Sequence, residues 1–215
     1  TLMALNTLPA GAFADDAISS DKINLANTFA FTGTVTGVPS GLTKIASHTI
    51  TAVNEFNITN IFSATYQNYR IIASGIGLLS TSGEQTFRLI DSGGSNVTTN
   101  YTNSSVGYTG SAGGAQRAGG FWRFHVTQSI YASSNAAEAP MVSMDIFNPF
   151  NASDTKFVGI THYRNSGNSA WITETLGGHN TNDTSCTGLN FVPDSSQTYA
   201  NGAGFTKIAV YGYEV

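Results

Sequence analysis

The feature that most constrains this fold is a period-two alternation of apolar and polar residues, which recurs in many short segments. The clearest case is the segment 121–130, where Trp122, Phe124, Val126 and Ile130 fall on one face and the polar residues Arg123, His125, Thr127 and Ser129 fall on the other. Successive side chains of a β-strand point to opposite faces, so this pattern predicts strands with one buried face. The same period recurs in Val142, Met144 and Ile146, and again in Ile208 and Val210.

Segments of this kind follow one another from about residue 45 onward. The candidate strands are 45–53, 55–63, 68–75, 85–91, 97–109, 119–131, 141–147, 155–163, 170–176, 186–192 and 205–214. Turn residues separate them, for example Ser82-Gly83 and Asn148-Pro149. Neither an intervening helical pattern nor an internal repeat is evident. The sequence therefore predicts an all-β fold, an antiparallel jelly-roll-like β-sandwich of about eight core strands.

Charged residues make up only 10% of the chain, against about 25% in an ordinary soluble domain. A polar surface with so few charges offers little repulsion between copies, which favours a homo-oligomer. The net charge is −4 and the nine basic residues are scattered, so we expect no nucleic-acid binding. No apolar run approaches the roughly 20 residues of a membrane-spanning helix, so we expect no membrane insertion.

The chain divides near Leu42. Residues 42–215 hold the strand pattern, whereas residues 1–41 lack the pattern of a core of their own. We expect residues 1–41 to form an extended N-terminal arm, for anchoring and oligomerisation, that is ordered by packing against something else. Its candidate anchoring residues are the apolar ones: Leu2, Leu5, Leu8, Phe13, Ile18, Ile23, Phe29 and Phe31.

Motifs for chemistry are sparse. The histidines His48, His125, His162 and His179 lack the spacing of a zinc site, and the polar loop 179–183 has too few carboxylates for calcium. We therefore expect no metal, no cofactor and no catalytic residue. A glycosidase needs two carboxyl groups about 5–10 Å apart, and the one candidate pair is Asp145 and Glu174. A polysaccharide-degrading enzyme is accordingly the least favoured hypothesis.

The lone cysteine, Cys186, cannot form an intrachain disulfide and is interpreted as a small residue near the start of a strand. This suits synthesis in a reducing cytoplasm, and the first residues lack the cationic start of a secretory signal. Tyrosines are the remaining candidates for a binding surface. Tyr101 and Tyr108, in the Gly/Asn/Ser-rich region 92–120, are predicted to be exposed and to serve recognition of a glycan or a protein.

Several segments together resemble a known group of proteins. They are Phe56–Ile72 with its Tyr66-Gln-Asn68-Tyr69 stretch, Phe87–Gly94, the closing strand Phe205–Tyr213, and in the arm Ala17–Ile23 and Phe31–Pro39. The first three resemble the β-sandwich domain of bacteriophage virion surface proteins, and the two arm segments resemble N-terminal segments of such proteins. The resemblance implies a homotrimer with a jelly-roll-like head and an anchoring N-terminal arm, and it brings no catalytic residues.

Two functions are compatible with that resemblance. The first is a capsid decoration (cement) protein on the virion surface, whose arm contacts the major capsid protein. The second is a short tail-fibre or appendage protein, assembled with tail components, that binds a host receptor such as a surface glycan through loops such as 92–120 and 177–185. Because residues 1–41 lead directly into the head, without the long shaft of many tail fibres, we favour the first function.

Overall fold

The computed structural model describes residues 41–50, 53–75, 85–108, 112–123, 140–165, 170–193 and 206–213. Every regular element in these ranges is a strand, which confirms the predicted all-β class. The strands are β1 (Leu42–Ile50), β2 (Phe56–Ile58), β3 (Asn68–Ser74), β4 (Gln85–Asp91), β5 (Tyr101–Tyr108), β6 (Ala112–Gly119), β7 (Trp122–Arg123), β8 (Met141–Phe147), β9 (Thr155–Arg164), β10 (Trp171–Asn180), β11 (Cys186–Pro193) and β12 (Thr206–Tyr213). Residues 1–40 of the predicted arm, with all its candidate anchoring residues, lie outside the described residues.

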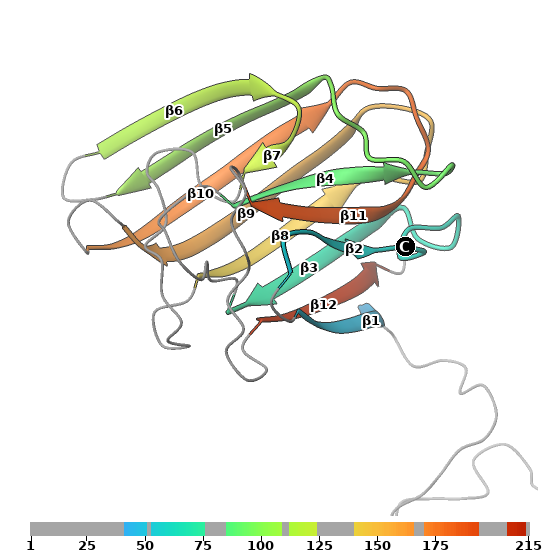
Figure 1. Ribbon diagram of the computed structural model, residues 1–215, viewed down its shortest axis with the longest axis horizontal. Coiled ribbons are helices and arrows are strands. Elements are labelled where there is room, and N and C mark those ends of the chain that lie inside the picture. The colour runs from blue at the N-terminus through green and yellow to red at the C-terminus, as the bar shows by residue number, and fades with distance from the viewer. Residues whose placement is uncertain are drawn as a thin grey trace, which may run out of the picture. The chain divides into compact units, whose positions relative to one another are not determined.

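The strands form two antiparallel sheets packed face to face (Figure 1). The larger sheet has the order β1-β12-β3-β8-β9-β10-β5-β6, and the smaller sheet has the order β2-β11-β4-β7. Setting aside the hairpins β5–β6 and β9–β10 leaves β1-β12-β3-β8 facing β2-β11-β4-β7. The first strand then pairs with the last, and the second with the second-last, which is the connectivity of a jelly roll. Both hairpins lengthen the larger sheet.

The core lies between the sheets and follows the predicted alternation. Val142, Met144 and Ile146 of β8 are at most 2% exposed. Aromatic rings from both sheets belong to the same core: the centroid of Trp122 lies 4.8 Å from that of Phe157 and 5.2 Å from that of Phe87. Burying a large apolar side chain stabilises a fold by about 1.5–3 kcal/mol. The predicted sandwich core is therefore confirmed for these strands.

Two local predictions were wrong. Arg123 was expected on a polar face, but it is only 9% exposed, and its guanidinium carbon lies 4.5 Å from the centroid of the Phe121 ring. The backbone N–H of Arg123 also donates a hydrogen bond to the side-chain oxygen of Asn103, so β7 is held against β5. Strand β6 was not predicted, because Ala112–Gly119 contains no large apolar residue to mark a buried face.

Candidate functional site: the outer face of the larger sheet

Exposed apolar side chains gather on the outer face of the larger sheet. In each of its central strands, alternate residues pack into the core and the intervening residues point outward. Of the seven large hydrophobic residues that are exposed in the described part of the chain, six lie on the neighbouring strands β3, β8, β9, β10 and β5. They are Ile72, Met141, Val158, Ile160, Trp171 and Val106. The seventh, Leu42, lies on the edge strand β1.

We use the name apolar patch for Ile72, Met141, Ile160, His162 and Trp171. Ser143 lies between Ile72 and Ile160 in the strand register, and Met141 lies opposite His162. The rings of His162 and Trp171 stack with an interplanar angle of 3° and centroids 5.0 Å apart. Four of the five patch residues, Ile72, Met141, Ile160 and His162, line a shallow hollow of about 260 Å³. The patch is therefore a continuous, weakly polar surface.

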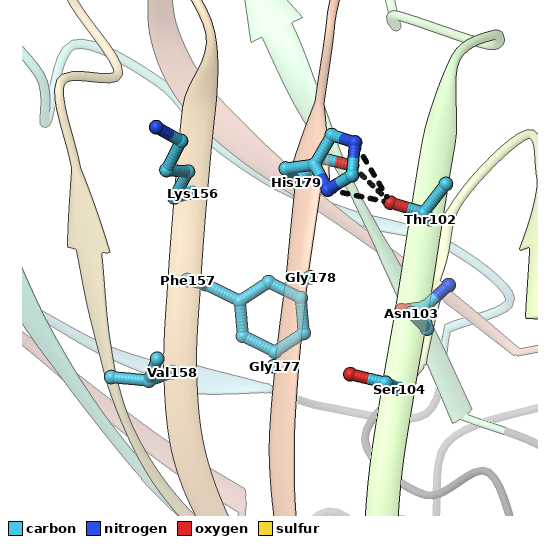
Figure 2. A pocket seen from close by; sticks show the side chains of 9 residues that line it. All are labelled: Thr102, Asn103, Ser104, Lys156, Phe157, Val158, Gly177, Gly178 and His179. Carbon is cyan, nitrogen blue, oxygen red and sulfur yellow. Dashed lines mark hydrogen bonds between the residues drawn. The ribbon is translucent and has the colours of Figure 1, made fainter. Parts of the chain in front are cut away.

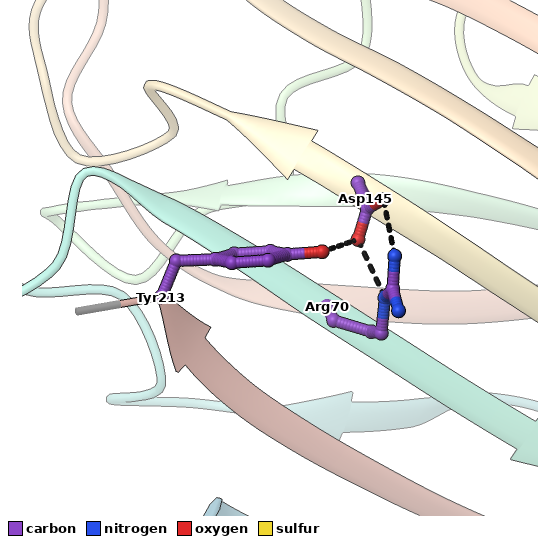
Figure 3. Close-up of polar contacts among 3 residues, drawn as sticks. All are labelled: Arg70, Asp145 and Tyr213. Atoms are coloured by element: carbon purple, nitrogen blue, oxygen red, sulfur yellow. Dashed lines mark hydrogen bonds and ion pairs between the residues drawn. The ribbon is translucent and has the colours of Figure 1, made fainter. Parts of the chain in front are cut away.

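A polar triad lies beside the patch on the same face (Figure 3). The guanidinium of Arg70 donates two hydrogen bonds to the carboxylate of Asp145, from Nε and from one terminal nitrogen, each 2.8 Å long. The hydroxyl of Tyr213 donates a third hydrogen bond to the same carboxylate. The opposite charges of Arg70 and Asp145 thus neutralise each other, and the triad adds little net charge to the face.

The triad shifts the pKa values of its members. Partial burial is the largest influence on Asp145 and acts to raise its pKa, but the hydrogen bonds from Arg70 and Tyr213 and the charge of Arg70 outweigh it and lower the pKa below 3.8. Burial, together with the hydrogen bond to Asp145, raises the pKa of Tyr213 to about 12. Asp145 therefore stays ionised and Tyr213 stays neutral at physiological pH.

A second hollow lies on this face over Gly177, and we call it the glycine hollow (Figure 2). Two rows of three residues line its outer surface: Lys156, His179 and Thr102 in one row, and Val158, Gly177 and Ser104 in the other. Its volume is about 440 Å³. A Cβ atom added to Gly177 would lie at least 3.8 Å from every heavy atom outside Gly177 and its two neighbours in the chain. The missing side chain therefore leaves open space.

The prediction that Tyr101 is exposed was wrong. Tyr101 is 1% exposed, and its hydroxyl donates to the carbonyl of Val97 and accepts from the backbone N–H of Leu89. Burial raises the pKa of this hydroxyl. The cause is the phase of β5, which directs Tyr101 and Asn103 into the sandwich and Thr102 outward. Tyr108 ends β5 opposite Thr173, and its side chain lies outside the described residues.

The carboxylates proposed as a catalytic pair point to opposite faces of the larger sheet. Asp145 points outward and binds Arg70. Glu174 alternates with outward-facing residues of β10, is 0% exposed, and accepts a 2.8 Å hydrogen bond from the hydroxyl of Tyr163. Two carboxyl groups on opposite sides of a sheet cannot flank one glycosidic bond. Asp145 and Glu174 are therefore not a glycosidase pair.

His179 and Asn180 of the predicted loop 179–183 are the last residues of β10, and residues 181–183 begin the connection to β11. The amide side chains of Asn180 and Asn182 both donate to the carbonyl of Thr99, and Thr102 bonds the ring of His179. In the described ranges, no three His, Cys, Asp or Glu side chains come close enough to hold a metal ion.

Cys186 is buried at the start of β11, as predicted, and burial raises the pKa of its thiol to about 12. Within the same described residues, no helix has the length and hydropathy needed to cross a bilayer. Comparison with known proteins adds no identification: no family model, no curated protein and no solved structure matches this chain.

Proposed function

We propose that this chain is a non-enzymatic structural protein of a bacteriophage virion, a homotrimer that decorates the outside of the capsid. The observation that carries the proposal is the concentration of exposed apolar side chains on one face of a jelly roll. The assignment to a phage is supported by the sequence resemblance described above. In this proposal the apolar patch joins copies of the chain to each other, and residues 1–41 attach the trimer to the major capsid protein.

The chemistry of the apolar patch suits contact with a second copy. Apolar surface that gathers in one contiguous area is typical of protein interfaces, and the centres of interfaces are poor in charged residues. Here Arg70 and Asp145, beside the patch, neutralise each other, and Arg164 lies opposite Trp171 at the margin of the patch. A cyclic trimer can bring three copies of one patch together at its axis. Each Ile or Met side chain that becomes fully buried would contribute about 1.5–3 kcal/mol before the costs of association.

A single substitution tests this interface. Ile160 is 54% exposed, so Ile160→Lys should leave the fold of one copy intact while placing three like charges at the trimer axis. We expect the native chain to sediment as a trimer and Ile160→Lys as a monomer with an unchanged circular dichroism spectrum. Thr59→Lys, on an exposed residue after β2 in the smaller sheet, is the matched control. A native monomer, or an Ile160→Lys trimer, would contradict the proposed interface.

A truncation tests the attachment. Residues 42–215 contain the whole described core, so we expect them to form a folded, soluble trimer that no longer binds capsids stripped of the protein. The full chain should bind the same capsids. If the truncated head bound as well as the full chain, attachment through residues 1–41 would be rejected.

The second candidate is a short tail-fibre or appendage protein that contacts a host receptor. The specific observation in its favour is the glycine hollow, which places hydroxyl groups and Lys156 around an open space on the outer face. Such a protein would be present in a small number of copies per virion, and the symmetry of the tail would set that number. Free protein added to host cells would block adsorption of the phage. A decoration protein would not block adsorption.

A further inference from the structure

The glycine hollow and the apolar patch adjoin on the same face, because Val158 of the hollow and Ile160 of the patch are two residues apart on β9, about 7 Å along the strand. Lys156 at the hollow and His162 at the patch are six residues apart on β9, which corresponds to about 20 Å at roughly 3.3 Å per residue. An interface centred on His162 and Trp171, at the far end of the patch, leaves the Lys156 end of the hollow open. The hollow needs a separate explanation.

The shape of the hollow suits a small, flat molecule. Gly177 forms a floor without a side chain, and Val158, which is 51% exposed, forms an apolar wall on the β9 side. On the β5 side, Ser104 and Thr102 present hydroxyl groups (Figure 2). A volume of about 440 Å³ falls within the range of small-ligand sites, about 300–1,000 Å³.

The polar groups around the hollow suit a sugar. Hydroxyl side chains can both donate and accept hydrogen bonds, as sugar hydroxyls do. The Thr102 hydroxyl is already oriented, because it lies 2.8 Å from Nδ1 of His179. An apolar wall beside hydroxyl groups matches a pyranose ring, which has an apolar C–H surface and a polar edge.

Lys156 adds one positive charge at the rim. It is exposed, and within the described part of the chain no carboxylate lies at salt-bridge distance from it. A single unpaired ammonium group next to hydroxyls favours one carboxylate rather than a phosphate, which usually engages several donors or a guanidinium. We propose that the glycine hollow binds a sugar unit that carries a carboxylate, such as an acidic residue of a polysaccharide. This proposal holds for either candidate function, because it concerns the isolated protein.

Two pairs of sugars test the proposal with the full-length protein. Glucuronate and glucose differ at C6, where a carboxylate replaces a hydroxymethyl group, and galacturonate and galactose form the same comparison. Saturation-transfer NMR titrations should show saturable binding of at least one acidic sugar. Its neutral counterpart should bind about fivefold more weakly, the size of one exposed ion pair. Lys156→Ala should abolish that preference.

Filling the hollow supplies the decisive variant. Gly177→Val should fold normally, since the space above Gly177 is open, and it should abolish binding of the acidic sugar. Ser104→Leu fills the hollow from β5 and should do the same, so the test does not depend on one variant. Met141→Ser, on the apolar patch opposite His162, should bind the sugar normally. Saturable binding of none of the four sugars would overturn the proposal, as would binding that persists in both filled variants.

Discussion

Two adjacent glycines of β10 are expected to respond oppositely to the same substitution. Gly177 points outward, and a Cβ atom there would lie 3.8 Å from the Ser104 hydroxyl oxygen and the Phe157 carbonyl oxygen, an ordinary contact distance. Gly178 points inward, and a Cβ atom there would overlap the ring of Phe157 and the carbonyl oxygen of Thr102. The carbonyl belongs to the paired strand β5, so it cannot move aside without disturbing that pairing.

The magnitudes follow from these contacts. Forcing an extra carbon into a filled site costs about 1–3 kcal/mol, so Gly178→Ala should lower the free energy of unfolding by about that amount. Gly177→Ala meets open space and restricts the unfolded chain, which should raise the free energy of unfolding by about 0.4–1 kcal/mol. The two variants should therefore differ by about 1.5–4 kcal/mol. With a urea slope of about 2 kcal/mol per M, their midpoints should differ by about 1–2 M.

Urea titration followed by tryptophan fluorescence measures this difference, because Trp122 is fully buried in the core. All variants must be compared at one protein concentration, since association stabilises the folded state by mass action. Equal midpoints for the two variants, or a lower midpoint for Gly177→Ala than for Gly178→Ala, would refute the assignment of these glycines to opposite faces.

Three further predictions concern single side chains. The pKa of Asp145 is lowered from 3.8, so its ionised form stabilises the fold above that pH, and this stabilisation is lost as the pH falls below it. On acid titration, Asp145→Asn should therefore lose less free energy of unfolding than the native chain. Identical pH profiles of the two proteins would contradict the triad. The Cys186 thiol should resist alkylation at pH 8 until the protein is unfolded in urea, because it is buried with a pKa of about 12; rapid native labelling would disprove its burial. Tyr101→Phe leaves the buried N–H of Leu89 without its acceptor and should lower the free energy of unfolding by about 1–3 kcal/mol in a urea titration; a neutral effect would rule out this hydrogen bond.

The alternation in the sequence was sufficient to predict the sandwich, since it places the buried residues of β8 and β12 correctly. It could not predict the phase of β5. The region 97–109 reads as one long strand, but Asn100 has a φ of 65°, a left-handed conformation that interrupts the chain just before Tyr101. Because side chains alternate with a period of two, the position of that break decides which residues point inward.

The candidate site was harder to predict than the fold. The run Phe157-Val158-Gly159-Ile160 is apolar on both faces of β9, and this was the available signal that the outer face is not an ordinary solvated surface. The glycine hollow has no local signal, because Thr102, Lys156 and Gly177 meet only when β5, β9 and β10 pair. Residues this far apart in the sequence can be placed together only by the topology of the sheet.

The most direct test of the proposed function is the number of copies of this chain in one particle. Quantitative mass spectrometry of purified virions of the phage proposed to encode the chain, with the major capsid protein as internal standard, gives that number. A trimeric decoration protein should be present in hundreds of copies, in a fixed ratio to the capsid protein. A virion preparation that lacks the chain would contradict a structural role, and a few copies per particle would replace capsid decoration with the appendage function.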